Sequence, residues 1–408
     1  MALPMGIGEH NAEYFACLGH ADREQPHGAR GSTVSGLIVH EWIEDRGGAE
    51  VVLDGMARSF PDADIQCLWN DAPSRFADRT VNETWLSTTA LRRHKALALP
   101  FTAAAWRRVP ATRQYDWMLI SSHLFAHHAH IAGQDVPKFV YAHTPARYIW
   151  NPELDGRGYS TAVRAVAPLF QALDRKRAQE ATAVACNSEF VRERIARAWE
   201  REAVVIHPPA PVDRILGRDD WRSAVTDEAE RRILDELPET FILGASRFVA
   251  YKRLDLVIDT AERLGVPVVI AGHGPDADML RSMAIDARIP ARIVESPSDE
   301  LLYALYQRAA VLVFPPVEDF GITPVEAQAA GTPVVVGPVG GQLETFTEGV
   351  SGVVAEATNA EAFADAVRAA WSLPRFDAQA VTERFAQEGF DERIRQFVRA
   401  STPLRVRG

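Results

Sequence analysis

Glu318 and Glu326 are the two side chains whose type and spacing point most directly to chemistry. They flank a glycine-bearing loop that follows the apolar run Val311–Phe314 and leads into a short helical segment. Open α/β sheets bind ligands beyond the carboxyl ends of their strands, where helix amino-termini also attract anions. Acids beside an anion site suit a ligand that offers hydroxyl groups to the acids and phosphates to the helix. A nucleotide-sugar offers both.

Each glutamate also has a structural explanation. Thr323 is a good N-cap, Pro324 is a good first helical residue, and Glu326 then falls at the capping-box position. Glu318 alone is an ordinary loop acid. The glycine-bearing loop and the β-like flanks on both sides favour a ligand site over two unrelated acids.

A cationic loop follows a second strand of the same half. Arg247, Lys252 and Arg253 come shortly after the predicted strand Phe241–Ala245. Arginine supplies a forked donor and lysine a point charge, so the loop suits a diphosphate. A solvated basic loop is the alternative.

Glycines follow three further strands. Gly272 and Gly274 come after Val268–Ala271, the pair Gly340–Gly341 comes after Thr332–Val336, and the pair Gly47–Gly48 comes after the first apolar run of the chain. Such positions let backbone N–H groups approach a phosphate. Plain tight turns explain them equally well from the sequence alone.

Size and charge narrow the class of protein. The chain has 408 residues, 47% of them hydrophobic, and a formal net charge of −11. We therefore expect two globular domains and no general affinity for nucleic acid. We find no signal-like N-terminus and no apolar run of membrane-spanning length, and the three cysteines, Cys17, Cys67 and Cys186, are scattered. These features indicate a cytoplasmic protein without disulfides.

Alternating apolar strands and helical stretches predict an α/β fold made of two Rossmann-like halves. The breaker His207–Pro211 marks the border between them. We predict an N-terminal extension (residues 1–32), a first domain (33–210), a second domain (211–385) and a C-terminal helical segment (386–408).

The stretch from Glu318 to Glu326, with seven residues between the acids, resembles the signature of retaining GT-B glycosyltransferases of family four, glycosyltransferases group 1. The segment His143-Thr-Pro-Ala-Arg147-Tyr-Ile-Trp150 resembles mannosyltransferase-like members of that family. The resemblance extends over about residues 36–390. It implies the GT-B fold: two Rossmann-like domains face a central cleft, and the C-terminal helix crosses back to the N-terminal, acceptor-binding domain.

The resemblance implies roles for individual residues. Arg247 and Lys252 match the family's phosphate clamp, Glu326 would hold ribose hydroxyls, and His143 would face the donor sugar. Together with Glu318, the clamp and His143 are the predicted catalytic residues. The predicted donor-binding residues are Gly48, Arg247, Lys252, Gly272, Glu318, Phe320, Gly321, Ile322 and Glu326, and the predicted acceptor-binding residues are His123, Arg147 and Trp150.

These roles imply transfer of a hexose, with GDP-mannose favoured as donor, to a hydroxyl of a glycan, lipid-linked or small-molecule acceptor. Glu295-Ser296 stands where relatives often carry glycine, which leaves the base open. We expect no cofactor and no essential metal, because Asp62-Ala-Asp64 and Asp276-Ala-Asp278 fit turns better than a metal site. Basic residues around Ala96–Ala105 suggest peripheral contact with the inner face of a membrane, or a solvated helix.

Other functions remain open at this stage. An epimerase or a phosphorylase can use the same fold, and a non-enzymatic two-lobed protein can bind a sugar. A nicotinamide oxidoreductase fits poorly, because the first glycine turn lacks the full G-x-G-x-x-G pattern.

Overall fold

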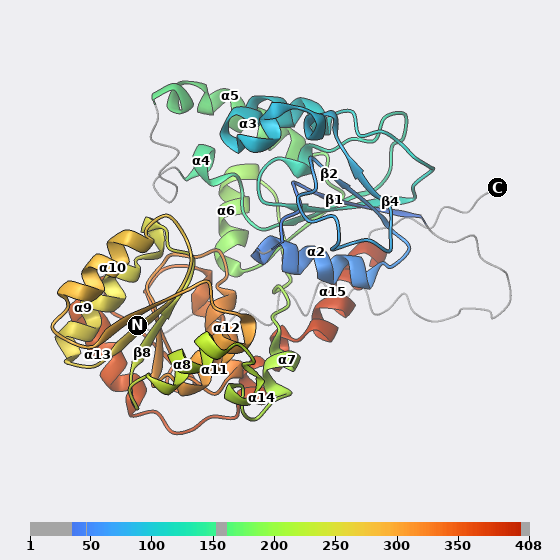
Figure 1. Ribbon diagram of the computed structural model, residues 1–408. Coiled ribbons are helices and arrows are strands. Elements are labelled where there is room, and N and C mark those ends of the chain that lie inside the picture. Colours follow the sequence, from blue (N-terminus) through green and yellow to red (C-terminus); the bar gives the residue numbers. More distant parts are fainter. Residues whose placement is uncertain (1–34, 46, 152–160, 401–408) are drawn as a thin grey trace, which may run out of the picture. The chain divides into compact units, whose positions relative to one another are not determined.

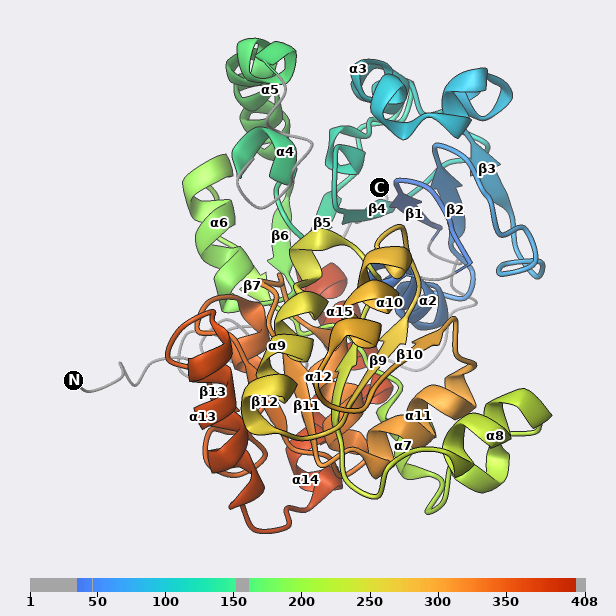
Figure 2. The same ribbon diagram turned by 60° about the vertical axis from the view of Figure 1, so that its left-hand side comes forward.

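The computed structural model describes residues 35–45, 47–151 and 161–400, which form two compact units (Figures 1 and 2). The first unit extends to Ile206 and takes up the chain again from Asp391, and the second comprises His207–Phe390. The predicted extension at residues 1–32 lies outside the described residues.

The first unit contains a seven-stranded parallel sheet in the order β3-β2-β1-β4-β5-β6-β7. Apart from the edge strand β3, nearly every strand residue is buried, as expected for a parallel sheet covered on both faces. The strands are β1 (Gly36–His40), β2 (Asp64–Cys67), β3 (Val81–Glu83), β4 (Trp117–Ser122), β5 (Lys138–Ala142), β6 (Ala183–Cys186) and β7 (Val204–Val205).

Helices α2 (Gly48–Ser59) and α15 (Gln387–Ala400) lie together against this sheet (Figure 1). The Ser59 hydroxyl donates to Asp391 Oδ1 at 3.0 Å, and the Phe397 ring lies 5.7 Å from that of Phe139 in β5. The predicted return of the C-terminal helix to the first domain is therefore confirmed.

A single apolar cluster fills the space between the sheet and the remaining helices of the first unit. Fully buried Trp69, Trp106, Trp199 and Phe125 are its largest members. The helices are α3 (Lys95–Trp106), α4 (Arg147–Trp150), α5 (Thr161–Ala178) and α6 (Glu189–Trp199), with short 3-10 segments η1 (Trp85–Thr88), η2 (Ala90–Arg93) and η3 (Ala126–His128).

The second unit contains a six-stranded parallel sheet in the order β10-β9-β8-β11-β12-β13. Alternate strand residues enter two separate cores: Leu243 and Leu312 belong to one, and Ile242 and Val313 to the other. The strands are β8 (Ile242–Ala245), β9 (Val268–Gly272), β10 (Ala291–Glu295), β11 (Val311–Phe314), β12 (Val334–Val336) and β13 (Gly352–Val354).

Helices on the two faces of this sheet complete the two cores (Figure 2). One face carries α9 (Leu254–Leu264), α10 (Ala277–Asp286) and α13 (Ala360–Trp371). The other carries α7 (Val212–Leu216), α8 (Glu228–Asp235), α11 (Asp299–Arg308), α12 (Ile322–Ala329) and α14 (Ala378–Thr382). Short 3-10 segments are η6 (Arg222–Ala224), η7 (Ala250–Lys252), η8 (Gly341–Glu344) and η9 (Glu383–Phe385).

Local signals explain where several helices begin. The Ser188 hydroxyl accepts from Val191 N at 3.1 Å and caps α6. The Asp227 side chain caps α8, because it accepts from the backbone N–H groups of Ala229 and Glu230. No described helix is both long and apolar enough to span a bilayer.

Candidate active-site residues

In the second unit, the strand order reverses between β8 and β11, which are neighbours. The loops that leave these two strands carry Lys252 and Glu318, whose Nζ and Oε1 atoms form an ion pair. Their side chains are only 12% and 15% exposed. Ligands of open α/β sheets bind at such a reversal, so two of the predicted residues meet where the topology favours a site.

Arg247 lies on the loop after β8 and is exposed. Its Nη2 atom is 3.0 Å from the Tyr251 hydroxyl, and in the described ranges no carboxylate pairs with it. Arg253, the third cation of this loop, pairs with Asp255 at 3.1 Å. Arg247 therefore presents a guanidinium that an anionic ligand can take without breaking an ion pair.

Glu326 lies on α12, and its Oε2 atom accepts from the Tyr306 hydroxyl at 3.0 Å. Burial raises the pKa of Glu326 to about 7, although the Tyr306 hydrogen bond opposes the shift. The capping explanation is wrong, because α12 begins at Ile322 and its N-cap is Gly321, without a side-chain cap. Tyr306 gave no signal in the sequence, because its partner lies twenty residues further along the chain.

Two of the predicted donor-binding glycines have positive φ. A Cβ on Gly272, at φ +150, would lie 1.8 Å from Ser246 O, so only glycine lets the loop after β8 pass the end of β9. Gly321, at φ 94, directs the chain into α12. Both positions have a conformational explanation whether or not a ligand binds.

The residues beside Gly321 differ in what they offer. The Phe320 side chain is buried, with its ring 5.5 Å from those of His207 and Phe385, so only its backbone is available to a ligand. Ile322 opens α12 and packs at the edge of the core. The first backbone amides of α12 are thus the polar groups of this segment.

Gln342 supports Glu318 and had no role in the sequence prediction. Its Oε1 atom accepts from the Glu318 backbone N–H at 3.1 Å, and its Nε2 donates to Val339 O at 2.6 Å. A Cβ on Gly340 would lie 2.1 Å from Gln342 Oε1. The Gly340–Gly341 pair therefore makes room for the amide that holds the Glu318 loop.

In the first unit, the strand order reverses between β1 and β4. His40 ends β1, His123 follows β4, and His143 follows β5. The His123 ring lies 5.7 Å from the ring of His40 and 6.2 Å from that of His143. The fold thus gathers the predicted residues His123 and His143 with a third histidine that the sequence did not single out.

A hydroxyl joins two of these histidines. Ser121 Oγ lies 2.8 Å from His143 Nε2 and 3.0 Å from His40 Nδ1. His40 Nε2 in turn lies 4.0 Å from Oε1 of Glu50 in the first turn of α2. Gly47 leaves room for the Glu50 carboxylate, since a Cβ on Gly47 would lie 2.0 Å from Glu50 Oε2.

The charge states of this cluster follow from its burial. Burial opposes ionisation of Glu50, but the interaction with the nearby His40 lowers its pKa to about 2. Burial holds the pKa of His143 well below its usual value, and the neighbouring His123 and His40 act in the same direction. The cluster thus contains an ionised carboxylate and a neutral His143 at physiological pH.

The predicted acceptor-side residues have separate surroundings. His123 Nδ1 lies 3.5 Å from Glu41 Oε2, and its ring meets Trp42 edge-on at 5.0 Å. Arg147 and Trp150 are the ends of the short helix α4. The Trp150 indole N–H donates to Asp174 at 2.8 Å, so only its ring is available to an acceptor. Gly48 is the first residue of α2.

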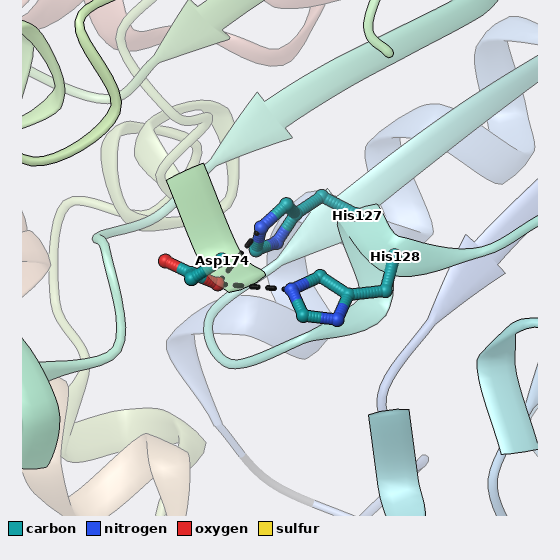
Figure 3. Close-up of side chains that lie close together, drawn as sticks. All are labelled: His127, His128 and Asp174. Atoms are coloured by element: carbon teal, nitrogen blue, oxygen red, sulfur yellow. Dashed lines mark hydrogen bonds and ion pairs between the residues drawn. The ribbon is translucent and has the colours of Figure 1, made fainter. Parts of the chain in front are cut away.

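Asp174 is the centre of a buried cluster with His127 and His128 (Figure 3). Both histidine Nε2 atoms lie 3.0 Å from Oδ1. The Trp199 indole N–H donates to Oδ2 at 2.7 Å, in addition to that of Trp150. The three ligand-type atoms lie within 4.8 Å of one another, a set that suits a divalent metal such as zinc. The two indole N–H groups and His128 also satisfy the carboxylate, although His127 Nε2 and His128 Nδ1 have no hydrogen-bond partner among the described residues.

The segment predicted to contact a membrane is α3 with its basic flanks. Leu97 and Phe101 are 62% and 46% exposed on this helix. Two of the basic residues are neutralised, because Arg92 pairs with Asp71 at 2.6 Å and Lys95 with Glu44 at 2.5 Å. Arg93 is exposed. The apolar face is present, but its cationic border is weaker than the sequence suggests.

The protein has two Rossmann-like domains, because each unit is a parallel sheet with helices on both faces. In each unit, polar residues cluster where the strand order reverses, which is where ligands of such sheets bind. Family models identify it further. Glycosyltransferase Family 4 matches residues 46–214, and Glycosyl transferases group 1 matches residues 226–388. The two matches together cover most of the chain, which belongs to these GT-B glycosyltransferases.

Similar proteins include enzymes from actinobacteria. The chain is 32% identical over 226 residues to a GDP-mannose-dependent alpha-(1-6)-phosphatidylinositol monomannoside mannosyltransferase from Mycolicibacterium smegmatis, a match that covers 51% of this chain and 58% of the relative. It is 30% identical over 201 residues to a D-inositol 3-phosphate glycosyltransferase from Mycobacterium avium, covering 46% and 47%. The matches thus span about half the length of these relatives.

Solved structures share the fold at low identity. Sucrose-phosphate synthase from Thermosynechococcus elongatus matches with a TM-score of 0.66 and 17% identity, over 90% of this chain and 98% of that one. Anabaena HepE in complex with UDP matches with a TM-score of 0.63 and 16% identity, over 90% and 100%. Likenesses at this identity establish the GT-B architecture.

Proposed function

We propose that this protein is a retaining glycosyltransferase that moves a hexose from a nucleotide-sugar to a hydroxyl of a glycan, a lipid-linked molecule or a small natural product. The observation that carries the proposal is the Lys252–Glu318 pair at the β8–β11 reversal. Arg247, on the same loop as Lys252, has no carboxylate partner among the described residues. The loops after two adjacent strands thus supply two cations, Arg247 and Lys252, for a phosphate and one acid, Glu318, for sugar hydroxyls.

On the donor side, Arg247 and Lys252 bind the diphosphate and stabilise the charge that grows on it as the leaving group departs. Glu318 releases Lys252 to the phosphate and accepts hydrogen bonds from the sugar, together with the backbone of Phe320, Gly321 and Ile322. Glu326 accepts from the ribose hydroxyls. Among the described residues Tyr306 donates to Oε2, which leaves the second carboxylate oxygen for the ligand.

The reaction we propose breaks the bond between the anomeric carbon and the diphosphate and forms one to the acceptor oxygen on the same face. A donor phosphate oxygen takes the acceptor proton, so no enzymic nucleophile is required. His143 accompanies the donor sugar, while His123, Arg147 and Trp150 contact the acceptor. We propose that no cofactor or metal takes part.

GDP-mannose is the donor we favour, because a relative at 32% identity is named as GDP-mannose-dependent and because the His143–Trp150 segment resembles mannosyltransferases. That relative is also named for a phosphatidylinositol acceptor. A lipid-linked acceptor would agree with peripheral contact of exposed Leu97 and Phe101 with the cytoplasmic face of a membrane.

Calorimetric titration with GDP, UDP and dTDP, followed by a screen of the matching sugar nucleotides, tests this function. We expect GDP to bind and Arg247→Ala to weaken that binding. The proposal would be wrong if none of the three diphosphates bound. Conversion of GDP-mannose without an acceptor would indicate an epimerase, a requirement for inorganic phosphate would indicate a phosphorylase, and binding without turnover would indicate a sugar-binding protein.

A further inference from the structure

A chain of buried polar groups leads from α2 to His143. It runs from the Glu50 carboxylate to His40, at 4.0 Å, then to Ser121 and His143 at 3.0 and 2.8 Å. His40 and Ser121 are fully buried, and Glu50 and His143 are 4% and 9% exposed. At 4.0 Å the Glu50–His40 contact is an ion-pair distance and not a hydrogen bond, and His40 Nε2 has no hydrogen-bond partner among the described residues. Ser121, in contrast, is hydrogen-bonded to both histidines, so the charge of Glu50 sets the order of the protons along that link.

The order follows from the ionised end of the chain. The negative charge of Glu50 favours the His40 proton on Nε2, the ring nitrogen that lies 4.0 Å from Glu50 Oε1. A histidine with one proton then has a bare Nδ1, which accepts the Ser121 hydroxyl proton. Ser121 has no second proton, so its oxygen accepts from His143 Nε2–H at 2.8 Å.

We propose that Glu50, His40 and Ser121 are positioning residues that fix the tautomer of His143, so that its Nδ1 is a hydrogen-bond acceptor for a hydroxyl group of the bound sugar. The inference rests on the proposed function for the identity of the ligand, and on the first unit alone for the tautomer. It explains why a glycine must stand at position 47, where a side chain would displace the carboxylate that starts the chain.

The surroundings of His143 agree with a fixed acceptor. In the described part of the chain, no protein group forms a hydrogen bond with its Nδ1 atom. The rings of Tyr141 and His123 lie beside it at 5.3 and 6.2 Å, and His123 Nδ1 in turn faces Glu41 at 3.5 Å. Burial also lowers the pKa of His143 well below its usual value, which keeps one nitrogen free of a proton.

The tautomer is directly measurable. Long-range nitrogen–proton correlation spectra of the full chain with labelled histidines distinguish a protonated Nε2 from a protonated Nδ1, and His143→Gln identifies the signal. We expect the wild-type spectrum to show His143 protonated on Nε2. The proposal would be overturned if His143 were protonated on Nδ1. A doubly protonated His40 would have this effect, because it would reverse the direction of the Ser121 hydroxyl.

Substitutions along the chain provide the controls. Ser121→Ala removes the link and should give a mixture of tautomers, and Ser121→Thr, which keeps the hydroxyl, should restore the wild-type signal. Glu50→Gln should also mix the tautomers, because an amide donates as readily as it accepts. Ser122→Ala is the matched control on the same strand: its hydroxyl contacts His127 at 3.1 Å, outside the chain, so the His143 signal should not change.

Activity gives an independent readout. We expect Ser121→Ala to lower kcat/KM for the donor by about 10- to 100-fold, the usual effect of losing a group that orients a site residue, and Ser121→Thr to recover most of it. Equal losses in both variants would reduce Ser121 to a packing role. The spectra need no sugar, so a failed donor screen would overturn the proposed function and leave the tautomer result intact.

Discussion

Asp174 in the first unit and Glu326 in the second are both carboxylates in the protein interior, yet they have opposite electrostatics. Burial opposes ionisation of Asp174, but the neighbouring His127 and His128 hold its pKa well below the usual range. Glu326 has the Tyr306 hydroxyl, and its pKa rises to about 7. The number of donors decides which buried acid is ionised.

The two carboxylates also differ in how many of their hydrogen-bonding positions the protein itself fills. Asp174 has both oxygens satisfied by protein groups and ties η3, α4, α5 and α6 together. Glu326 has hydrogen-bonding capacity left over, which a ligand with hydroxyl groups can use. A saturated buried carboxylate contributes to stability, whereas an undersatisfied one at the edge of a sheet is suited to binding.

The largest effect should come from Asp174→Asn, which replaces an acceptor oxygen with an amide that faces N–H donors. We expect the free energy of unfolding to fall by about 3–5 kcal/mol, as for a broken buried pair, measured by urea denaturation. Glu193→Gln is the control, because the Glu193–Arg197 pair is about 70% exposed and should change stability by at most about 0.5 kcal/mol. Equal effects would remove the distinction between the two carboxylates.

The clamp should show the next largest effect. We expect both Arg247→Ala and Lys252→Ala to reduce turnover about 100- to 1000-fold, the usual effect of removing one group that stabilises developing charge. Their stabilities should differ. Lys252→Ala leaves the largely buried Glu318 without its cation and should lower the melting temperature, whereas exposed Arg247 has no carboxylate partner among the described residues. Normal turnover in either variant would contradict the clamp.

Glu326→Gln should weaken nucleoside-diphosphate binding about tenfold, because hydrogen bonds to a charged acceptor contribute about 1.5–3 kcal/mol. Calorimetry measures this directly. Asp174→Asn, where it folds, should bind the same ligand with unchanged affinity. Unchanged affinity in Glu326→Gln would show that its free oxygen is not used by the ligand.

The pH dependence of stability should have opposite signs for the two regions. The folded pKa of Glu326, about 7, lies above its ordinary 4.5, so its contribution falls as the pH rises from 4.5 to 7. The folded pKa of His128 is lowered to about 4, mainly by burial, so its contribution grows between pH 4 and 6.5. As the pH rises from 4.5 to 7, Glu326→Gln should therefore gain stability relative to wild type, by at most about 1.4 kcal/mol per pH unit. Denaturation curves at several pH values test the sign.

The smallest expected effect is that of a chelator. The N–H donors around Asp174 already satisfy its oxygens, so we expect removal of divalent ions to leave both melting temperature and turnover unchanged. Mass-spectrometric metal analysis of the purified protein is the check. One tightly bound ion per chain, lost on His128→Ala, would make this cluster a metal centre.

The second unit was the more predictable one from the sequence. Strand β11 has the predicted bounds Val311–Phe314, and the loops that carry Arg247, Lys252 and Glu318 follow adjacent strands. These features depend on local apolar runs and on glycine turns. The capping explanation of Thr323 failed because the chain turns into α12 two residues earlier, at Gly321 with φ 94.

Fewer features of the first unit could be predicted from the sequence, because its contacts join residues that are far apart along the chain. His40 and Ser121 are 81 residues apart, as are the strands that bring them together. Asp174 meets His128 across 46 residues and Trp199 across 25. β3 (Val81–Glu83) was missed, since three half-exposed residues give no period. The resemblance located His143, but only the fold showed which groups surround it.

The return of α15 to the first unit has a consequence for biosynthesis. Ser59 and its partner Asp391 are 332 residues apart, and Phe397 covers Phe139 from near the end of the chain. A ribosome therefore completes all strands of the second unit before it releases the helix that covers the first. The part of the molecule made earliest is the last to close, and a nascent chain stopped before residue 391 would expose the apolar surface of β5.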